Sequence, residues 1–372
     1  MRWVNPGDIR VDWSRLVAVT APLILIPPDA NGFCAGRPAG IFPNITFPEE
    51  PPLVRSQEEN KFGQMAWKEL RQIITEYRRS DGPFALATLV KSSGSTYRQS
   101  GSRMLILEGG LFVGRLSAGC LEEEVADLAQ AVILHGKPAR CSFDLRSRFA
   151  CNGSIEVFIE RLVKPNEFLD ELADVLGNRT PLTVSTNYQA TDPGAGTRLI
   201  DVPLAEHPED FVQEIQPPVR LVIFGEYFDA ESVAYLGGYL GWEVEFVADA
   251  DELPHGDLRT ACVVMSHHFG RDIVALKQVL QGRYGYVGLL GPRQRKRLLL
   301  NRLIDDGCQL ANISALHSPA GLDIGSETAE EIAMAIVAEI QAALMGRNGG
   351  PLRDRAEPIH KLREPICCDG LR

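Results

Sequence analysis

Residues Val219 to Ala230 read VRLVIFGEYFDA, an apolar run that ends in a glycine and leads into a helical pattern. After Pro217-Pro218 the sequence alternates between short apolar runs and helix-length stretches. The apolar runs cover 219–224, 243–247, 261–266 and 286–290, and the helical stretches cover 230–240 and 273–280. This strand–helix alternation predicts an α/β domain with a doubly wound parallel sheet, which we place at residues 219–346.

Gly225 follows the first of these strands, at the place where such a sheet binds the phosphates of a dinucleotide. A dinucleotide fingerprint requires a second glycine at position 227, and Tyr227 fills that place. Asp249, just past the second strand, suits a ribose hydroxyl, and the helix after Gly225 offers free N–H groups to an anion. We therefore expect Gly225 and Asp249 to line a cofactor crevice but disfavour bound NAD(P). The alternative is a Rossmann-like scaffold whose crevice is empty or serves another ligand.

Two further positions follow later strands of the same predicted sheet. His268, in Ser266-His267-His268, is a candidate ligand or acid/base group, and the alternative is a histidine satisfied within its own loop. Arg293 opens a basic run after Gly291-Pro292. It is the candidate for binding a phosphate, and the alternative is a solvated helix face.

The first half of the chain has a different pattern. A helix from Trp67, a strand over 84–90, a hairpin over 104–113, a helix over 121–134 and strands over 140–145 and 154–159 predict an α+β domain. We place this domain at residues 61–162. Residues 1–60 are an irregular, proline-rich extension, 163–218 a connecting region with one helix and a polar loop, and 347–372 a polar tail.

The α+β domain contains the best candidate site, in the stretch from Gly94 to Met104 and in Ser117-Ala118-Gly119-Cys120. Glycines allow a ligand to approach the backbone, arginines bind anions, and a thiol binds sulfur or a soft metal. The candidate residues of this domain are Gly94, Ser95, Arg98, Arg103, Gly119, Cys120 and Cys151. The alternatives are an arginine pair that binds backbone carbonyls and cysteines that are buried structural thiols.

Bulk properties limit the class of protein. The net charge of -11 argues against nucleic-acid binding, which requires a basic surface. The eight cysteines form no regular framework, which indicates reduced thiols and a cytoplasmic location. The apolar run from Leu16 to Ile26 is too short to span a membrane and lacks a convincing cleavage site.

Several segments resemble the XdhC/CoxI family. Ala87-Thr88-Leu89-Val90, Gly94 to Met104 and Gly119-Cys120-Leu121-Glu122 are similar to its N-terminal domain. Phe224-Gly225, Leu240-Gly241-Trp242, the run from Tyr286 to Gly291 and the run from Ser318 to Gly325 are similar to its C-terminal Rossmann-like domain. The resemblance covers about Trp67 to Leu344. The chain departs from the family pattern at Ala118, at Asn152 and at Glu226-Tyr227-Phe228.

The resemblance implies a role in the maturation of molybdenum hydroxylases such as xanthine dehydrogenase. A family member is expected to bind the molybdenum cofactor transiently, with Cys120 as a ligand for the metal. It is expected to protect the cofactor during sulfuration and to deliver it to the apoenzyme, without turnover of its own. The implied partners are the hydroxylase apoenzyme and a cysteine desulfurase, and a homodimer is one alternative for the oligomeric state. An NAD(P)-dependent oxidoreductase and a docking protein that has lost cofactor binding remain competing hypotheses.

Overall fold

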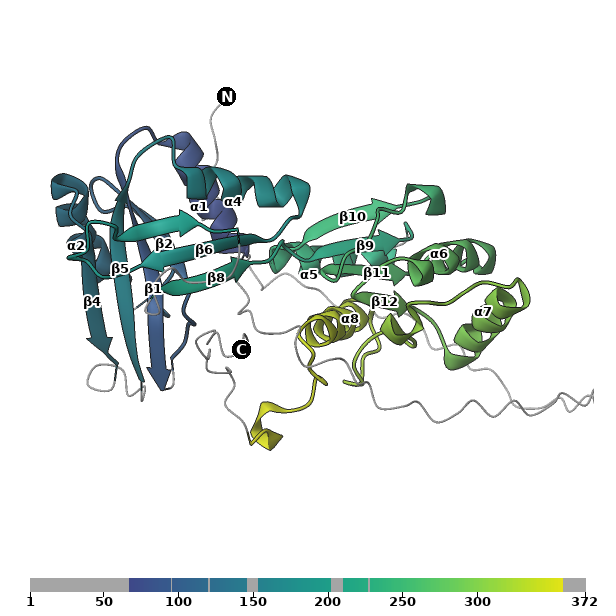
Figure 1. Ribbon diagram of the computed structural model, residues 1–372. Helices are drawn as coiled ribbons and strands as arrows, with labels where there is room; N and C mark the ends of the chain where they lie inside the picture. Colours follow the sequence, from purple (N-terminus) through teal and green to yellow (C-terminus); the bar gives the residue numbers. More distant parts are fainter. Residues whose placement is uncertain are drawn as a thin grey trace, which may run out of the picture. The chain divides into compact units, whose positions relative to one another are not determined.

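The computed structural model of the chain describes residues 67–94, 96–119, 121–145, 153–201, 210–226 and 228–356. These residues form three sheets (Figure 1). No helix within the described ranges is long and apolar enough to cross a membrane. The predicted extension over 1–60, the end of the predicted tail and five singled-out residues lie outside the described residues: Ser95, Cys120, Cys151, Asn152 and Tyr227.

Sheet A is antiparallel, with the strand order β3-β2-β1-β5-β4. Its strands are β1 (Phe84–Gly94), β2 (Arg103–Leu107), β3 (Phe112–Gly114), β4 (Ala139–Asp144) and β5 (Gly153–Leu162). Central β1 pairs with β5 from Phe84↔Leu162 to Gly94↔Gly153. This register sets the end of β1 beside the start of β5.

Helices cover both faces of sheet A. Because side chains alternate along a strand, Ala85 and Ala87 of β1 pack with α2 (Glu122–His135), whereas Phe84 and Leu86 lie in the opposite core. That second core also contains the buried sides of α1 (Trp67–Arg79) and α4 (Glu167–Asn178). The α+β character predicted for this half of the chain is confirmed.

The region over 163–218 contains more structure than the sequence predicted. After α4 come β6 (Leu182–Asn187), β7 (Gly196–Leu199) and β8 (Phe211–Ile215), which form antiparallel sheet B in the order β7-β6-β8. Val184 and Ile215 of this sheet lie in the same apolar cluster as α1 and α4. Sheet B therefore shares a core with the α+β domain.

Sheet C is the predicted parallel sheet, with the order β10-β9-β11-β12-β13. Its strands are β9 (Arg220–Phe224), β10 (Glu243–Val247), β11 (Thr260–Val264), β12 (Tyr286–Leu289) and β13 (Leu316–His317). Buried residues of α5 (Phe228–Tyr239) and α8 (Ala329–Leu344) pack in one core, and those of α6 (Phe269–Gln281) and α7 (Arg293–Asp305) pack in another. The doubly wound prediction is confirmed, and the switch point of the strand order lies between β9 and β11.

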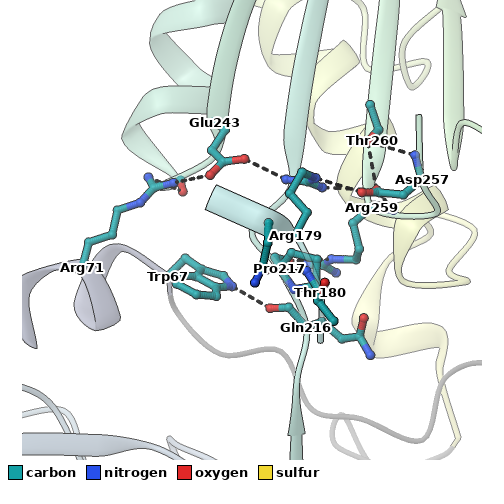
Figure 2. Close-up of polar contacts among 12 residues, drawn as sticks. Trp67, Arg71, Arg179, Thr180, Gln216, Pro217, Glu243, Asp257, Arg259 and Thr260 are labelled. Atoms are coloured by element: carbon teal, nitrogen blue, oxygen red, sulfur yellow. Dashed lines mark hydrogen bonds and ion pairs between the residues drawn. The ribbon is translucent and has the colours of Figure 1, made fainter. Parts of the chain in front are cut away.

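Polar contacts join helices of the first domain to the amino ends of sheet C strands (Figure 2). Arg179, after α4, donates from Nε to Asp257 Oδ2 at 2.8 Å and from Nη1 to Glu243 Oε2 at 2.7 Å. Arg71 of α1 donates to the carbonyl oxygen of Gly241 at 2.9 Å, and Trp67 Nε1 donates to that of Gln216 at 2.8 Å. Glu243 begins β10 and Asp257 precedes β11. The carboxyl edge of sheet C, where such sheets bind ligands, is the other edge.

Candidate functional site

Two of the predicted site segments start from neighbouring points at one end of sheet A. Gly94, the last residue of β1, pairs with Gly153, and the carbonyl oxygen of Gly153 accepts a hydrogen bond from Leu145 N at 3.0 Å. The segment with Ser95 therefore leaves the sheet beside both ends of the segment with Cys151. The antiparallel register brings Gly94 beside Gly153 although more than fifty residues separate them in the sequence.

The third predicted segment, with Gly119 and Cys120, begins α2. Gly119 is exposed, with φ 109°, a conformation that favours glycine. Leu121 borders a cleft of about 490 Å³ that lies between α2 and β4. The lining residues are Leu121, Glu124 and Leu128 of the α2 side and Cys141, Ser142, Phe143 and Asp144 of β4. This cleft joins the start of α2 to the end of β4, from which the segment with Cys151 departs.

Glu122 is the carboxylate that holds this segment, a role that the sequence did not predict. Its side chain is buried, and Oε1 accepts from Leu116 N at 3.1 Å and Ser117 N at 2.7 Å. Its Oε2 accepts from Ser117 Oγ at 2.7 Å and Leu121 N at 3.1 Å. Burial raises the pKa of Glu122, but these hydrogen bonds outweigh it and hold the pKa below its usual value.

The described cysteines are of two kinds. Cys141 is half-buried in the cleft, and burial together with the charge of Glu124 raises the pKa of its thiol. Cys262 lies inside β11, where burial raises the pKa of the thiol to about 12. The described residues contain no group of three or more His, Cys, Asp and Glu side chains that could hold a metal ion. A metal ligand in this half of the chain therefore stays a prediction for Cys120.

The two candidate arginines bind groups of the protein itself. Arg98 forms an ion pair with Glu69 of α1 and stays partly exposed. Arg103 is buried at the start of β2, where Nη1 donates to the carbonyl oxygen of Gly101 at 3.0 Å and to Gln213 Oε1 at 2.7 Å. The contact with a backbone carbonyl agrees with the alternative considered for this pair. Anion binding stays a prediction, and the exposure of Arg98 makes it the more accessible of the two.

The second group of predicted residues lies at the carboxyl edge of sheet C. Gly225 is buried against β11, and a Cβ there would lie 2.6 Å from the carbonyl oxygen of Met265. Asp249 and His268 are both exposed and cap helices: Asp249 Oδ1 accepts from Asp251 N at 3.1 Å, and His268 Nδ1 accepts from Arg271 N at 3.3 Å. Arg293 is the exposed first residue of α7. Parallel strands bring these residues to one edge of a single sheet, separate from sheet A.

The sequence analysis missed a contact across the switch point of sheet C. His267 Nε2 lies 2.8 Å from Asp229 Oδ2, which links the segment after β11 to the first turn of α5. His267 has φ 55°, rare for a residue with a side chain. Beside it, buried Asp272 accepts from Ser266 Oγ at 2.5 Å and from Arg295 Nη2 at 2.6 Å. The sequence marked the two adjacent histidines, but only the side-chain contact in the structure shows that His267 is the one that faces Asp229.

Comparison with known proteins agrees with both domains. The sequence model of the XdhC and CoxI family matches residues 77–144, and that of the XdhC Rossmann domain matches residues 221–340. The chain belongs to the XdhC/CoxI family. These matches cover both the segment with Gly119 and Cys120 and the parallel sheet, as the quoted sequence segments predicted.

Individual relatives of this XdhC/CoxI chain have several names. A Bacillus subtilis protein named as a probable subunit of xanthine dehydrogenase is 29% identical over 313 residues, which are 68% of this chain and 91% of the relative. The Escherichia coli molybdenum cofactor insertion chaperone PaoD is 24% identical over 266 residues, 68% of this chain and 81% of PaoD. A crystal structure described as a xanthine dehydrogenase from Bacillus halodurans is similar with a TM-score of 0.64 and 25% identity, covering 75% of this chain and 97% of that chain.

Proposed function

We propose that this chain is an accessory protein that binds the molybdenum cofactor, protects it during sulfuration and delivers it to a xanthine dehydrogenase-type hydroxylase. The relative named as a cofactor insertion chaperone supports this role. The structural observation that carries it is the convergence at one end of sheet A. Gly94, Leu145 and Gly153 lie side by side there, and Leu121 borders the cleft that reaches Asp144.

The chemistry of this end of sheet A fits the cofactor. When bound, the cofactor supplies a molybdenum centre held by dithiolene sulfurs, the place where a terminal sulfur would be exchanged. The Cys120 thiol is a suitable soft ligand, and the exposed backbone at Gly119 allows close approach of a ligand. The partly exposed guanidinium of Arg98, which pairs with Glu69 of α1, is the candidate for the phosphate. These groups bind and shield a ligand, which is the task of an accessory protein.

The test is cofactor retention by the full-length protein. Cys120→Ala should lower the molybdenum cofactor that co-purifies from a molybdenum-replete host at least fivefold, measured by fluorescence after oxidation of the pterin. Cys308→Ala is the matched control, because Cys308 packs partly buried in the α6–α7 core of sheet C. Equal retention by wild type and Cys120→Ala would remove the thiol from the mechanism.

The competing functions have separate readouts. The switch point between β9 and β11 is the place where a parallel sheet of this type binds nucleotides. If the protein is an NAD(P)-dependent oxidoreductase, calorimetric titration with NAD or NADP should therefore show heat of binding. Co-purification of a hydroxylase without any cofactor would instead indicate a docking protein. The cysteine desulfurase and a second copy of the chain are further partners to assay in the same pull-down.

A further inference from the structure

Glu122 occupies an unusual place for a carboxylate at the start of a helix. Its neighbours Glu123 and Glu124 are exposed, whereas Glu122 is only 3% exposed and turns back onto the segment that precedes α2. No salt bridge within the described residues gives this carboxylate a cation. A buried carboxylate without a cation is costly unless hydrogen bonds replace its hydration.

The hydrogen bonds of Glu122 reach described residues on both sides of Gly119. Its oxygens accept from the backbone N–H groups of Leu116, Ser117 and Leu121 and from the Ser117 hydroxyl. The same hydroxyl oxygen accepts from Gly119 N at 3.2 Å. These hydrogen bonds hold the backbone N–H groups of residues 116, 117, 119 and 121. In the sequence, position 120 lies between two of these residues.

Two apolar side chains, one at each end of this segment, anchor it in the core of the domain. Leu116 and Leu121 are each only 1% exposed and belong to the apolar cluster between sheet A and α2. The segment between Leu116 and Leu121 is therefore held by two buried apolar side chains at its ends and by the carboxylate of Glu122. Gly119 is exposed between them, and a Cβ there would meet no atom within 4 Å, so its outer side is open.

We propose that Glu122 is the positioning residue of the cofactor site: its carboxylate, with the Ser117 hydroxyl, fixes the backbone at Leu116, Ser117, Gly119 and Leu121 and thereby restrains the chain on both sides of Cys120. This inference rests on the proposed function, in which that thiol is the ligand. A thiol ligand is effective only when its backbone holds it at the position of the metal. Glu122 supplies that constraint without contacting the cofactor itself.

The test compares Glu122→Gln with Glu123→Gln, which removes the same charge from an exposed neighbour in the same helical turn. The first readout is the rate of alkylation of Cys120 by iodoacetamide as a function of pH, followed by peptide mass spectrometry. A lost charge shifts this profile along the pH axis, whereas a loosened backbone changes the plateau above the pKa of the thiol. Glu122→Gln should raise the plateau at least fivefold, and Glu123→Gln should leave it within twofold.

The second readout is retention of molybdenum cofactor released from a purified hydroxylase, which Glu122→Gln should lower at least fivefold. An unchanged plateau and unchanged retention in Glu122→Gln, with retention lost in Cys120→Ala, would overturn the positioning role and leave the proposed function intact. A raised plateau in Glu122→Gln together with normal retention in Cys120→Ala would show that Glu122 restrains the segment, but it would overturn the role of the thiol and, with it, the role of Glu122 in the cofactor site. Should Glu122→Gln fail to fold, Ser117→Ala removes one of the four bonds and should raise the plateau about twofold.

Discussion

At the residue scale, Gly225 is the position where the carboxyl edge of sheet C tolerates no side chain. Its φ is 148°, and a Cβ would lie 2.6 Å from the carbonyl oxygen of Met265 and 2.9 Å from its carbonyl carbon. Backbone atoms directly after the central strand β11 cannot move aside cheaply. We expect Gly225→Ala to lower the free energy of unfolding by about 3 kcal/mol, measured by urea denaturation.

Gly238 is the matched control for this prediction. It lies in α5 of the same domain, and a Cβ there would meet no atom within 4 Å. Gly238→Ala should therefore stabilise the protein by roughly 0.5 kcal/mol, because alanine restricts the unfolded chain. Equal effects of the two substitutions would show that close packing against Met265 is not what requires glycine at position 225.

At the scale of elements, α1 links the candidate site to the rest of the molecule. Its Glu69 binds Arg98, and its Arg71 binds Gly241 next to β10. We expect Glu69→Gln to increase amide hydrogen exchange across residues 96–102 at least threefold, because Arg98 loses the only ion-pair partner that the described residues give it. Glu76→Gln, near the end of the same helix, should leave that exchange unchanged. Equal exchange in both variants would contradict the role of Glu69.

The elements that the sequence predicted correctly are those whose burial follows one simple period. The apolar runs of β9 and β11 are predictable because both faces of these strands are covered. Sheet B escaped prediction because β7 is four half-buried residues and β8 buries the polar Gln213 between Phe211 and Ile215. Gln213 is buried because it binds Arg103, which lies more than a hundred residues earlier in the sequence. A contact of that range leaves no local pattern.

The candidate site shows the same limit. Its segments were predictable from their glycines, thiols and arginines, since those residue types carry the chemistry. The meeting of the end of β1 with the start of β5 depends on the pairing of Gly94 with Gly153, which is a property of the sheet register. The burial of Glu122 depends on a turn of the backbone that brings Leu116 and Ser117 to its carboxylate. Three glutamates in a row look alike in the sequence, and only one of them is buried.

At the scale of the whole molecule, Arg179 is the centre of the polar contacts between the first domain and sheet C (Figure 2). Its side chain is 8% exposed and binds both Asp257 and Glu243. We expect Arg179→Ala to lower the free energy of unfolding by roughly 2 kcal/mol, because two carboxylates lose a charged donor. Scanning calorimetry should then resolve separate transitions for the two domains. Arg302→Ala, which breaks the exposed pair with Asp306, is the control and should change neither measurement.

Acid should weaken the contact between Arg179 and Asp257, because the pKa of the Asp257 carboxyl is lowered in the folded protein. Burial raises the pKa of its carboxyl, but the hydrogen bonds and charge of Arg179, with bonds from Thr260 and Arg259 N, outweigh burial and lower it. Arg259 adds a further cation there, and burial lowers the pKa of that guanidinium to about 10. A carboxyl whose pKa falls on folding stabilises the protein above its unfolded pKa of about 3.9, and the stabilisation is lost as pH falls through the folded value.

The stability difference between wild type and Arg179→Ala should therefore be constant from pH 7 to about pH 5 and shrink below about pH 4. Urea denaturation of both proteins across this range measures it directly. A difference that stays constant down to pH 3 would mean that packing of the arginine side chain, rather than its charge, joins the two domains, because only the charged contact requires ionised carboxylates.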